Sequence, residues 1–180
     1  MGGMITSKII DVLNLHCVER NNGVVLHSIK FEDIVFKKRN MILCFYCGNY
    51  SKKWTCPPRI PDIDYKSVFS EYDNFALLHI KMDSKYDSSR TDSSVILHKE
   101  LLEMEEILYN NNQSTRLSFI GGSCKLCKNG CADDYCRQPY QARIPLEATG
   151  VDVIETSKNV GISITFPVKD YLTRTGLIMW

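Results

Sequence analysis

The chain has 180 residues, of which 44% are hydrophobic and 24% are charged. This is the size of one ordinary domain with a core of its own, and we expect residues 1–180 to form a single domain. The formal charge is only +1, so the composition gives no indication of a nucleic-acid partner or an anionic membrane. No stretch has the pattern of a secretion signal or a membrane span, so we expect a cytoplasmic protein that binds neither membrane nor nucleic acid.

The first predicted element is a helix near the N-terminus. Apolar side chains recur there at every fourth position: Ile5, Ile9, Leu13 and Cys17. This spacing predicts a short amphipathic helix that ends before Asn21. Because Cys17 lies on its apolar side, we expect it to be a small buried core residue and not a ligand.

Strands are expected in the next part of the chain. Residues 24–44 alternate β-branched and aromatic clusters with polar turns, which predicts short strands leading into Cys44. A short helix is predicted within 62–72. The segment 74–82 is apolar almost throughout and predicts a buried strand, and the polar residues 85–94 predict a loop.

The clearest predicted helix spans 95–109, with leucines on one side and glutamates on the other. A strand over 116–120 follows it and runs directly into Gly121. Strand, helix and strand in succession are typical of a crossover between parallel strands, so we expect an α/β domain with a mixed sheet and crossover helices. A cysteine-rich metal-binding loop would then lie at the carboxyl edge of the sheet. Three more elements complete the prediction: a helix after Pro145 and strands over 162–168 and 172–180.

Seven of the eight cysteines fall into two groups along the sequence. The first group is Cys44, Cys47 and Cys56, and the second is Cys124, Cys127, Cys131 and Cys136. Two cysteines separated by two residues can turn both sulfurs toward one ion or one face of a cluster. Since a reducing cytoplasm disfavours disulfides, we interpret these seven cysteines as metal ligands.

Two kinds of metal centre fit these groups. The first two cysteines of each group could together make a four-thiolate zinc site, but that arrangement leaves three cysteines without a role. Four cysteines within 124–136, separated by short and unequal gaps, fit a 4Fe-4S cluster better, because the corners of a cubane are spread around a body larger than one ion. We therefore predict one or two 4Fe-4S clusters, with zinc as the alternative.

The first group has one thiol fewer than a closed cubane needs. Its remaining iron would be open to water, sulfide, a substrate or a fourth ligand, which an Asp, a His or Cys17 could supply. Aromatic residues predict an apolar shell around this group: Phe45, Tyr46, Tyr50 and Trp54. Basic residues beside both groups could offset the negative charge of thiolate-ligated clusters: Lys52, Lys53, Arg59, Lys125, Lys128 and Arg137.

Three segments resemble a known family: CFYCGNY and WTCPP within 44–58, GGSCKLCKNGC at 121–131, and CRQPYQARIPLEATGVDV at 136–153. They are similar to domain of unknown function 2284, a family of predicted metal-binding proteins found chiefly in anaerobic archaea and bacteria. The resemblance implies metal bound by the seven grouped cysteines in an α/β domain, and it supplies no reaction. Five further positions match without an assigned role: Arg137, Pro139, Arg143, Glu147 and Gly150.

The resulting hypothesis is an iron–sulfur protein that transfers electrons to a redox partner protein. Two alternatives stay open: an enzyme that uses the open iron of the three-cysteine site, and a zinc-stabilised interaction module. We predict no catalytic residue. The four histidines are scattered singly, and His79 lies within an apolar strand, where a buried and satisfied imidazole is expected.

Overall fold

The computed structural model describes residues 2–180, with side chains described from residue 8 onward. Within these residues one four-stranded sheet has the order β1-β2-β4-β3. Its strands are β1 (Val24–Ile29), β2 (Phe75–Asp83), β3 (Leu117–Phe119) and β4 (Tyr171–Met179). The helices are α1 (Gly2–Arg20), α2 (Arg39–Phe45), α3 (Tyr65–Phe69), α4 (Ser89–Asn110) and α5 (Val153–Asn159), with 3-10 turns η1 (Phe31–Asp33) and η2 (Leu146–Thr149).

The sheet is antiparallel throughout, so the prediction of a mixed sheet is wrong. The crossover itself is present, because α4 connects β2 to β3 and these two strands run in the same direction. However, β4 lies between them and pairs antiparallel with both, through Phe75–Met179 and Leu117–Met179. The inserted strand is the last in the chain, and sequence order alone cannot place such a distant strand in the sheet.

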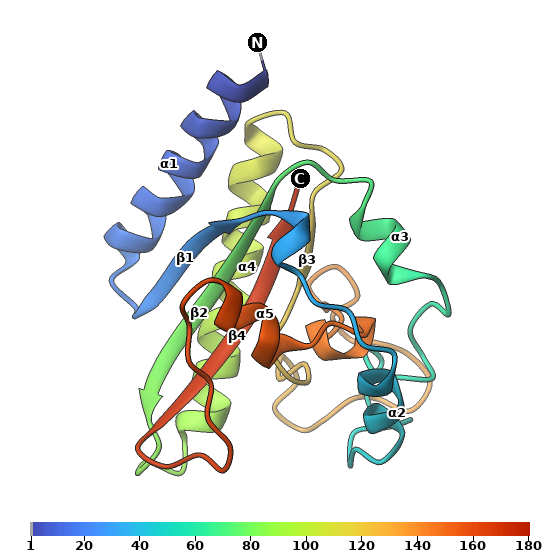
Figure 1. Ribbon diagram of the computed structural model, residues 1–180. Coiled ribbons are helices and arrows are strands. Elements are labelled where there is room, and N and C mark those ends of the chain that lie inside the picture. The colour runs from blue at the N-terminus through green and yellow to red at the C-terminus, as the bar shows by residue number, and fades with distance from the viewer. Residues whose placement is uncertain (1) are drawn as a thin grey trace.

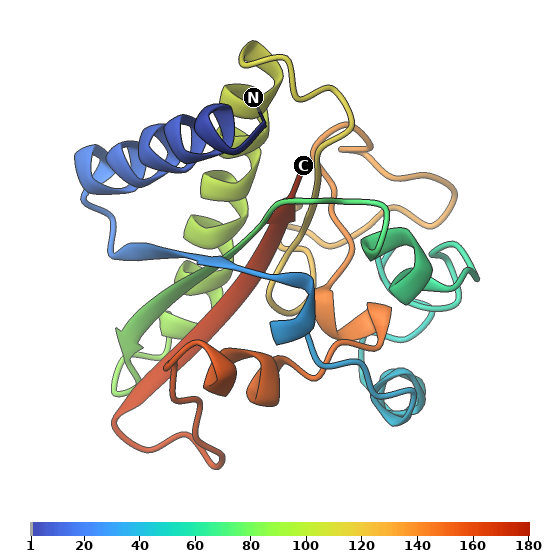
Figure 2. The same ribbon diagram turned by 45° about the horizontal axis from the view of Figure 1, so that its top comes forward.

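Helices lie on both faces of the sheet, as Figures 1 and 2 show. On one face Ala76, Leu78 and Ile80 of β2 pack against α1 and α4. On the other face Phe75 and Leu77 pack with α3 and the segment that contains η2. A strand covered on both faces needs apolar residues at nearly every position, which explains the continuous apolar run over 74–82.

Several predicted elements are confirmed, namely the helices at α1, α3 and α4 and the strands at β1, β2, β3 and β4. The side chain of Ile5 lies outside the described residues. The loop prediction for 85–94 is wrong in its second half, because α4 already begins at Ser89. Asp92 lies in its first turn, where a carboxylate favours the positive end of the helix dipole. The helix expected after Pro145 is the short turn η2 followed by α5.

Two predicted strands are absent from the described residues. The apolar segment leading to Cys44 is the helix α2, in which no residue is buried. A short apolar run is compatible with either element, and here no strand edge lies beside it. Residues 162–168 form a loop, in which Pro167 has no N–H to donate to a ladder. No helix within residues 2–180 is long and apolar enough to cross a membrane.

Candidate metal centre

The second cysteine group lies in a long irregular loop that is closed at its base. The Ile120 N–H donates to the Ile144 carbonyl at 3.0 Å, and the Leu146 N–H donates to the Ile120 carbonyl at 2.8 Å. Residues 121–144 between these points contain no helix or strand. The two hydrogen bonds continue the sheet edge beyond β3, so the loop leaves a rigid element and returns to it.

The four cysteines of this loop line one small pocket: Cys124, Cys127, Cys131 and Cys136. Burial is the largest influence that raises the pKa of Cys124, and the three other thiols raise it further. Cys124 therefore lies near the three other thiols. Lys53 and Arg137 line the same pocket, in agreement with the prediction that cations lie beside the ligands.

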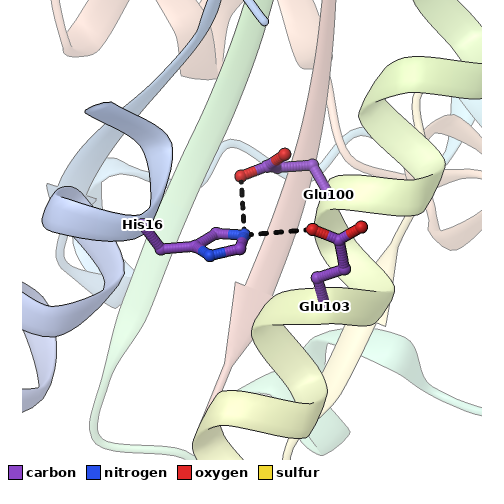
Figure 3. A group of neighbouring side chains, drawn as sticks. All are labelled: His16, Glu100 and Glu103. Atoms are coloured by element: carbon purple, nitrogen blue, oxygen red, sulfur yellow. Dashed lines mark ion pairs between the residues drawn. The ribbon is translucent and has the colours of Figure 1, made fainter. Parts of the chain in front are cut away.

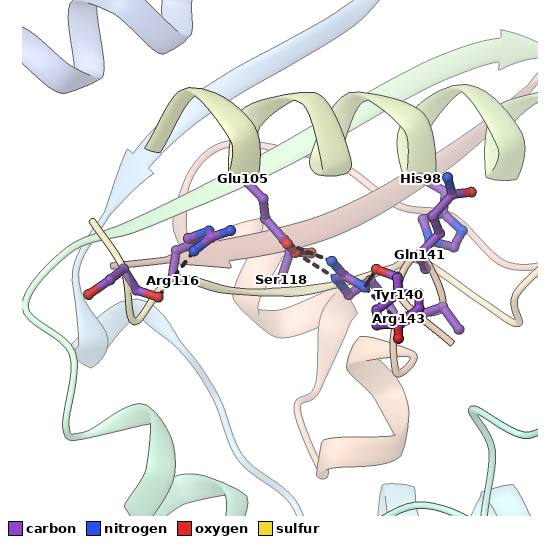
Figure 4. Close-up of polar contacts among 9 residues, drawn as sticks. His98, Glu105, Arg116, Ser118, Tyr140, Gln141 and Arg143 are labelled. Atoms are coloured by element: carbon purple, nitrogen blue, oxygen red, sulfur yellow. Dashed lines mark hydrogen bonds and ion pairs between the residues drawn. The ribbon is translucent and has the colours of Figure 1, made fainter. Parts of the chain in front are cut away.

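The returning end of the loop is fastened to α4 (Figure 4). Arg143 donates two hydrogen bonds to the Glu105 carboxylate, from Nε at 2.7 Å and from Nη2 at 2.6 Å. The Ser118 hydroxyl of β3 also donates to Glu105. About two turns earlier on the helix, the His98 ring lies 2.8 Å from the Gln141 carbonyl. These contacts give a structural role to Arg143, one of the matched family positions.

We expect Arg143→Ala to destabilise the protein by about 2 kcal/mol, because it leaves the buried Glu105 carboxylate with one hydroxyl partner. Urea unfolding measured by circular dichroism would show the change. Lys128→Ala, at an exposed position of the same loop, is the control and should be neutral. Equal stability of the two variants would mean that Arg143 does not hold the loop.

The first cysteine group begins in the short helix α2 and continues through tight turns. Cys44 lies in α2, and the Cys47 N–H donates to the Cys44 carbonyl at 3.1 Å. The Cys56 N–H donates to the Lys53 carbonyl at 3.1 Å in a similar turn. Asn49 Nδ2 lies 3.7 Å from Cys47 Sγ, within reach of a hydrogen bond to sulfur. The prediction that Cys44 ends a strand is therefore wrong, but the turn between the paired cysteines is present.

Backbone contacts place α2 beside the segment that follows the second cysteine loop. The Lys37 N–H donates to the Gly150 carbonyl at 2.7 Å, and Asn40 Nδ2 donates to the Val151 carbonyl at 3.1 Å. Gly150 adopts a φ of +87°, a left-handed conformation that favours glycine. The two cysteine groups are thus held by neighbouring segments although they are far apart in sequence.

The three cysteines of the first group line a cavity of about 710 Å³. Burial and the charges of Cys47 and Cys44 raise the pKa of Cys56 to about 11. Burial and the charge of Glu147 raise the pKa of Cys44. Glu147 and Arg174 line the same cavity, whose other walls are mostly apolar. This volume is typical of a pocket for a small organic ligand.

Glu147 and Arg174 form the polar end of that cavity. Glu147 accepts a hydrogen bond from the Gly122 N–H at 3.3 Å, and burial raises the pKa of its carboxyl group. Arg174 donates to the Gly121 carbonyl at 2.9 Å and to Ser93 Oγ at 3.0 Å. The sequence alone assigns no role to Glu147 and gives no indication of Arg174, whose place beside the cavity depends on the unexpected position of β4.

The two cysteine groups adjoin each other. Thr55 lines the pocket of the second group, and its chain neighbour Cys56 lines the cavity of the first. Trp54 joins the two segments directly, because its Nε1 donates to the Ala132 carbonyl at 2.8 Å. The Arg59 guanidinium stacks on the Trp54 ring, 4.2 Å from its centroid. Trp54 therefore lies between the groups, whereas Phe45 and Tyr46 are exposed.

The arrangement of the cysteines disfavours one zinc site shared between the two groups. The first two cysteines of each group line different cavities, which disfavours a zinc site shared between the groups. Tetrahedral zinc with ligands at about 2.3 Å would bring sulfurs to within about 3.8 Å of one another. Among the described residues, no three cysteine sulfurs all lie within 4.8 Å of one another. Within the described residues the cysteine sulfurs therefore do not form a compact tetrahedral set.

Cys17 lies apart from both groups, as predicted. It is buried in the core beneath α1 and lines neither cavity. Burial, together with the nearby Glu100, raises the pKa of the Cys17 thiol to about 12, so it remains protonated near neutral pH. Cys17 is therefore a core residue of the fold.

We expect Cys17→Ser to retain the full iron content of the wild-type protein, because the serine hydroxyl is also small and can donate to Glu100. Iron would be counted in protein purified anaerobically, and circular dichroism would verify folding. Loss of iron from a folded variant would place Cys17 among the ligands.

The sequence profile of one family, described as predicted metal-binding protein (DUF2284), matches residues 27–180. The match includes both cysteine groups and begins after α1. No curated protein matches the chain, and neither does any solved structure.

Proposed function

The chain belongs to the DUF2284 family of predicted metal-binding proteins, and from that premise we propose that its cysteine groups hold 4Fe-4S clusters that transfer electrons. Cys124, Cys127, Cys131 and Cys136 would hold a closed cluster, and Cys44, Cys47 and Cys56 would hold a second one. Such clusters supply one-electron redox chemistry. This proposal depends on one observation. The two cysteine groups lie next to each other, since Thr55 lines the pocket of the second group and Cys56 lines the cavity of the first.

The protein side chains around the clusters would set the redox potential and the route to a partner. Lys53 and Arg137 line the pocket of the closed group, where positive charge favours the reduced form. Exposed apolar residues surround the first group on α2 and the following turn: Ile42, Leu43, Phe45 and Tyr46. Exposed apolar side chains close together in the chain favour a protein contact, so they support a redox partner protein at this end.

A redox titration of the anaerobically purified protein, followed by EPR, tests electron transfer. We expect two reversible one-electron steps, with spectra broadened by the interaction of two neighbouring centres. Lys53→Gln should shift one midpoint potential to a lower value, and Lys8→Gln, which is exposed on α1 and lines neither cavity, should not. Irreversible loss of the clusters on reduction would contradict a role in electron transfer.

A second candidate function is an iron–sulfur enzyme, and the 710 Å³ cavity beside the first group favours it. A cluster with three protein thiolates has one iron without a cysteine ligand. Glu147 lines the cavity together with Cys44 and is the candidate for the fourth ligand. If no side chain held that iron, it would be open to a ligand in the cavity, and Arg174, which lines the same cavity, would orient a negatively charged group.

EPR spectra with and without cyanide distinguish these arrangements. A wild-type signal that changes with cyanide would support an open iron. If cyanide changes the EPR signal of Glu147→Gln but not that of the wild-type protein, Glu147 is supported as the fourth ligand. The iron would then be accessible only when the carboxylate is absent. An EPR signal that cyanide changes in neither protein would contradict the enzyme hypothesis. Asp152→Asn, on the same cavity wall, is the matched acidic control.

A further inference from the structure

A histidine of α1 and two glutamates of α4 meet where these helices pack (Figure 3). His16 Nε2 lies 3.2 Å from Glu100 Oε1 and 3.3 Å from Glu103 Oε2. The three ligand atoms all lie within 4.8 Å of one another. No cysteine of either group belongs to this cluster, and α1 precedes the residues that match the family profile.

Outer partners orient both carboxylates toward the histidine. Asn22 Nδ2 donates to Glu100 Oε2 at 2.6 Å, and Arg20 Nη2 donates to Glu103 Oε1 at 2.8 Å. Each carboxylate therefore uses one oxygen for its outer partner and presents the other to His16. Metal-binding carboxylates are held in the same way, by hydrogen bonds from a surrounding layer of side chains.

The atoms that face one another are buried without hydrogen bonds. His16 Nε2 and Glu100 Oε1 are both buried and have no hydrogen-bond partner. The two atoms lie 3.2 Å apart, but they form no hydrogen bond with each other. The side chain of Glu100 is fully buried, with an exposed fraction of 0%. A buried carboxylate oxygen is costly unless it is paired or coordinates a metal. A cation among the three atoms would satisfy both orphaned atoms at once.

The local charge also favours a cation. Glu100 and Glu103 face the histidine from α4, and Arg20 offsets one of them from the exposed side. One imidazole nitrogen and two carboxylate oxygens suit zinc and the other divalent transition metals better than calcium or magnesium.

We propose that His16, Glu100 and Glu103 form a second metal site, which binds one divalent transition-metal ion and fastens α1 to α4. Water would complete the coordination, because the protein supplies three ligands. The site is independent of the cysteine centres and of their redox function. Its role is structural, since the ion would bridge the N-terminal helix to the longest helix of the fold.

Manganese binding to the cluster-loaded protein tests this site. Mn²⁺ prefers oxygen and nitrogen ligands, so it reports on this cluster and not on thiolates. We expect EPR to show about one bound Mn²⁺ per chain, displaced by Zn²⁺. Glu103→Gln should weaken Mn²⁺ binding at least about tenfold, while it keeps an oxygen for Arg20. Glu106→Gln, exposed on the same helix, should bind Mn²⁺ as the wild type does.

Thermal unfolding gives a second measurement that does not depend on the affinity for manganese. Zn²⁺ should raise the Tm of the wild-type protein and of Glu106→Gln, and leave that of Glu103→Gln unchanged. If the three residues form only an ion pair, the wild-type protein will bind no Mn²⁺ and show no such rise in Tm. That result, or equal metal binding by the two glutamate variants, would overturn the proposal.

Discussion

Gly121→Ala should destabilise the protein by about 3 kcal/mol or more and should reduce its iron content. A Cβ atom at this position would lie 2.2 Å from the Thr175 carbonyl oxygen and 2.6 Å from Arg174 Cγ. The carbonyl belongs to the backbone of β4, which cannot move without disturbing its pairing with β2. The entry into the second cysteine loop would therefore be displaced from the sheet.

Gly48→Ala is the matched control for this substitution. Gly48 lies beside Cys47, but a Cβ atom there meets no atom within 4 Å. We expect nearly unchanged stability and a full complement of iron. Unfolding in guanidinium chloride under anaerobic conditions measures the stability of both variants. Similar midpoints for the two would show that the close approach of Gly121 to β4 does not constrain the loop.

If each group holds its own 4Fe-4S cluster, as we propose, Cys131→Ser should remove about half of the iron and sulfide and leave the other centre bound. Its stability should also fall by several kcal/mol, on the order of the folding free energy that a structural metal contributes. Iron, sulfide and visible absorbance would be measured on protein purified anaerobically.

Cys56→Ser is the comparison from the first group, and it should remove the complementary half of the iron. The double variant should contain almost no iron. Loss of all the iron in either single variant would mean that the two groups share one centre. Unchanged iron in Cys131→Ser would exclude this residue from the ligand set.

Residues 74–82 and 95–109 show which parts of the fold a single sequence can predict. Both have strong hydrophobic patterns, which arise from burial on two faces of a sheet and on one side of a helix. Residues 41–47 were misassigned because an exposed apolar run of this length has no pattern that separates a strand from a helix. The position of β4 depends on contacts between distant segments, which leave no local pattern.

The candidate site was predictable in its cysteines, because the spacing of Cys124 to Cys136 itself indicates shared ligation. The surrounding groups were not predictable. Arg174 reaches Gly121 only because β4 is inserted beside β3, and Glu105 reaches Arg143 across the packing of α4. The cluster of His16 with two glutamates depends in the same way on the packing of α1 against α4.

Counting iron, labile sulfide and zinc in protein purified under strictly anaerobic conditions tests the central claim most directly. Two 4Fe-4S clusters predict about eight iron and eight sulfide per chain. Zinc at the site of His16 would add about one ion per chain without replacing iron. Stoichiometric zinc without iron or sulfide, bound by the grouped cysteines, would contradict the assignment of iron–sulfur clusters.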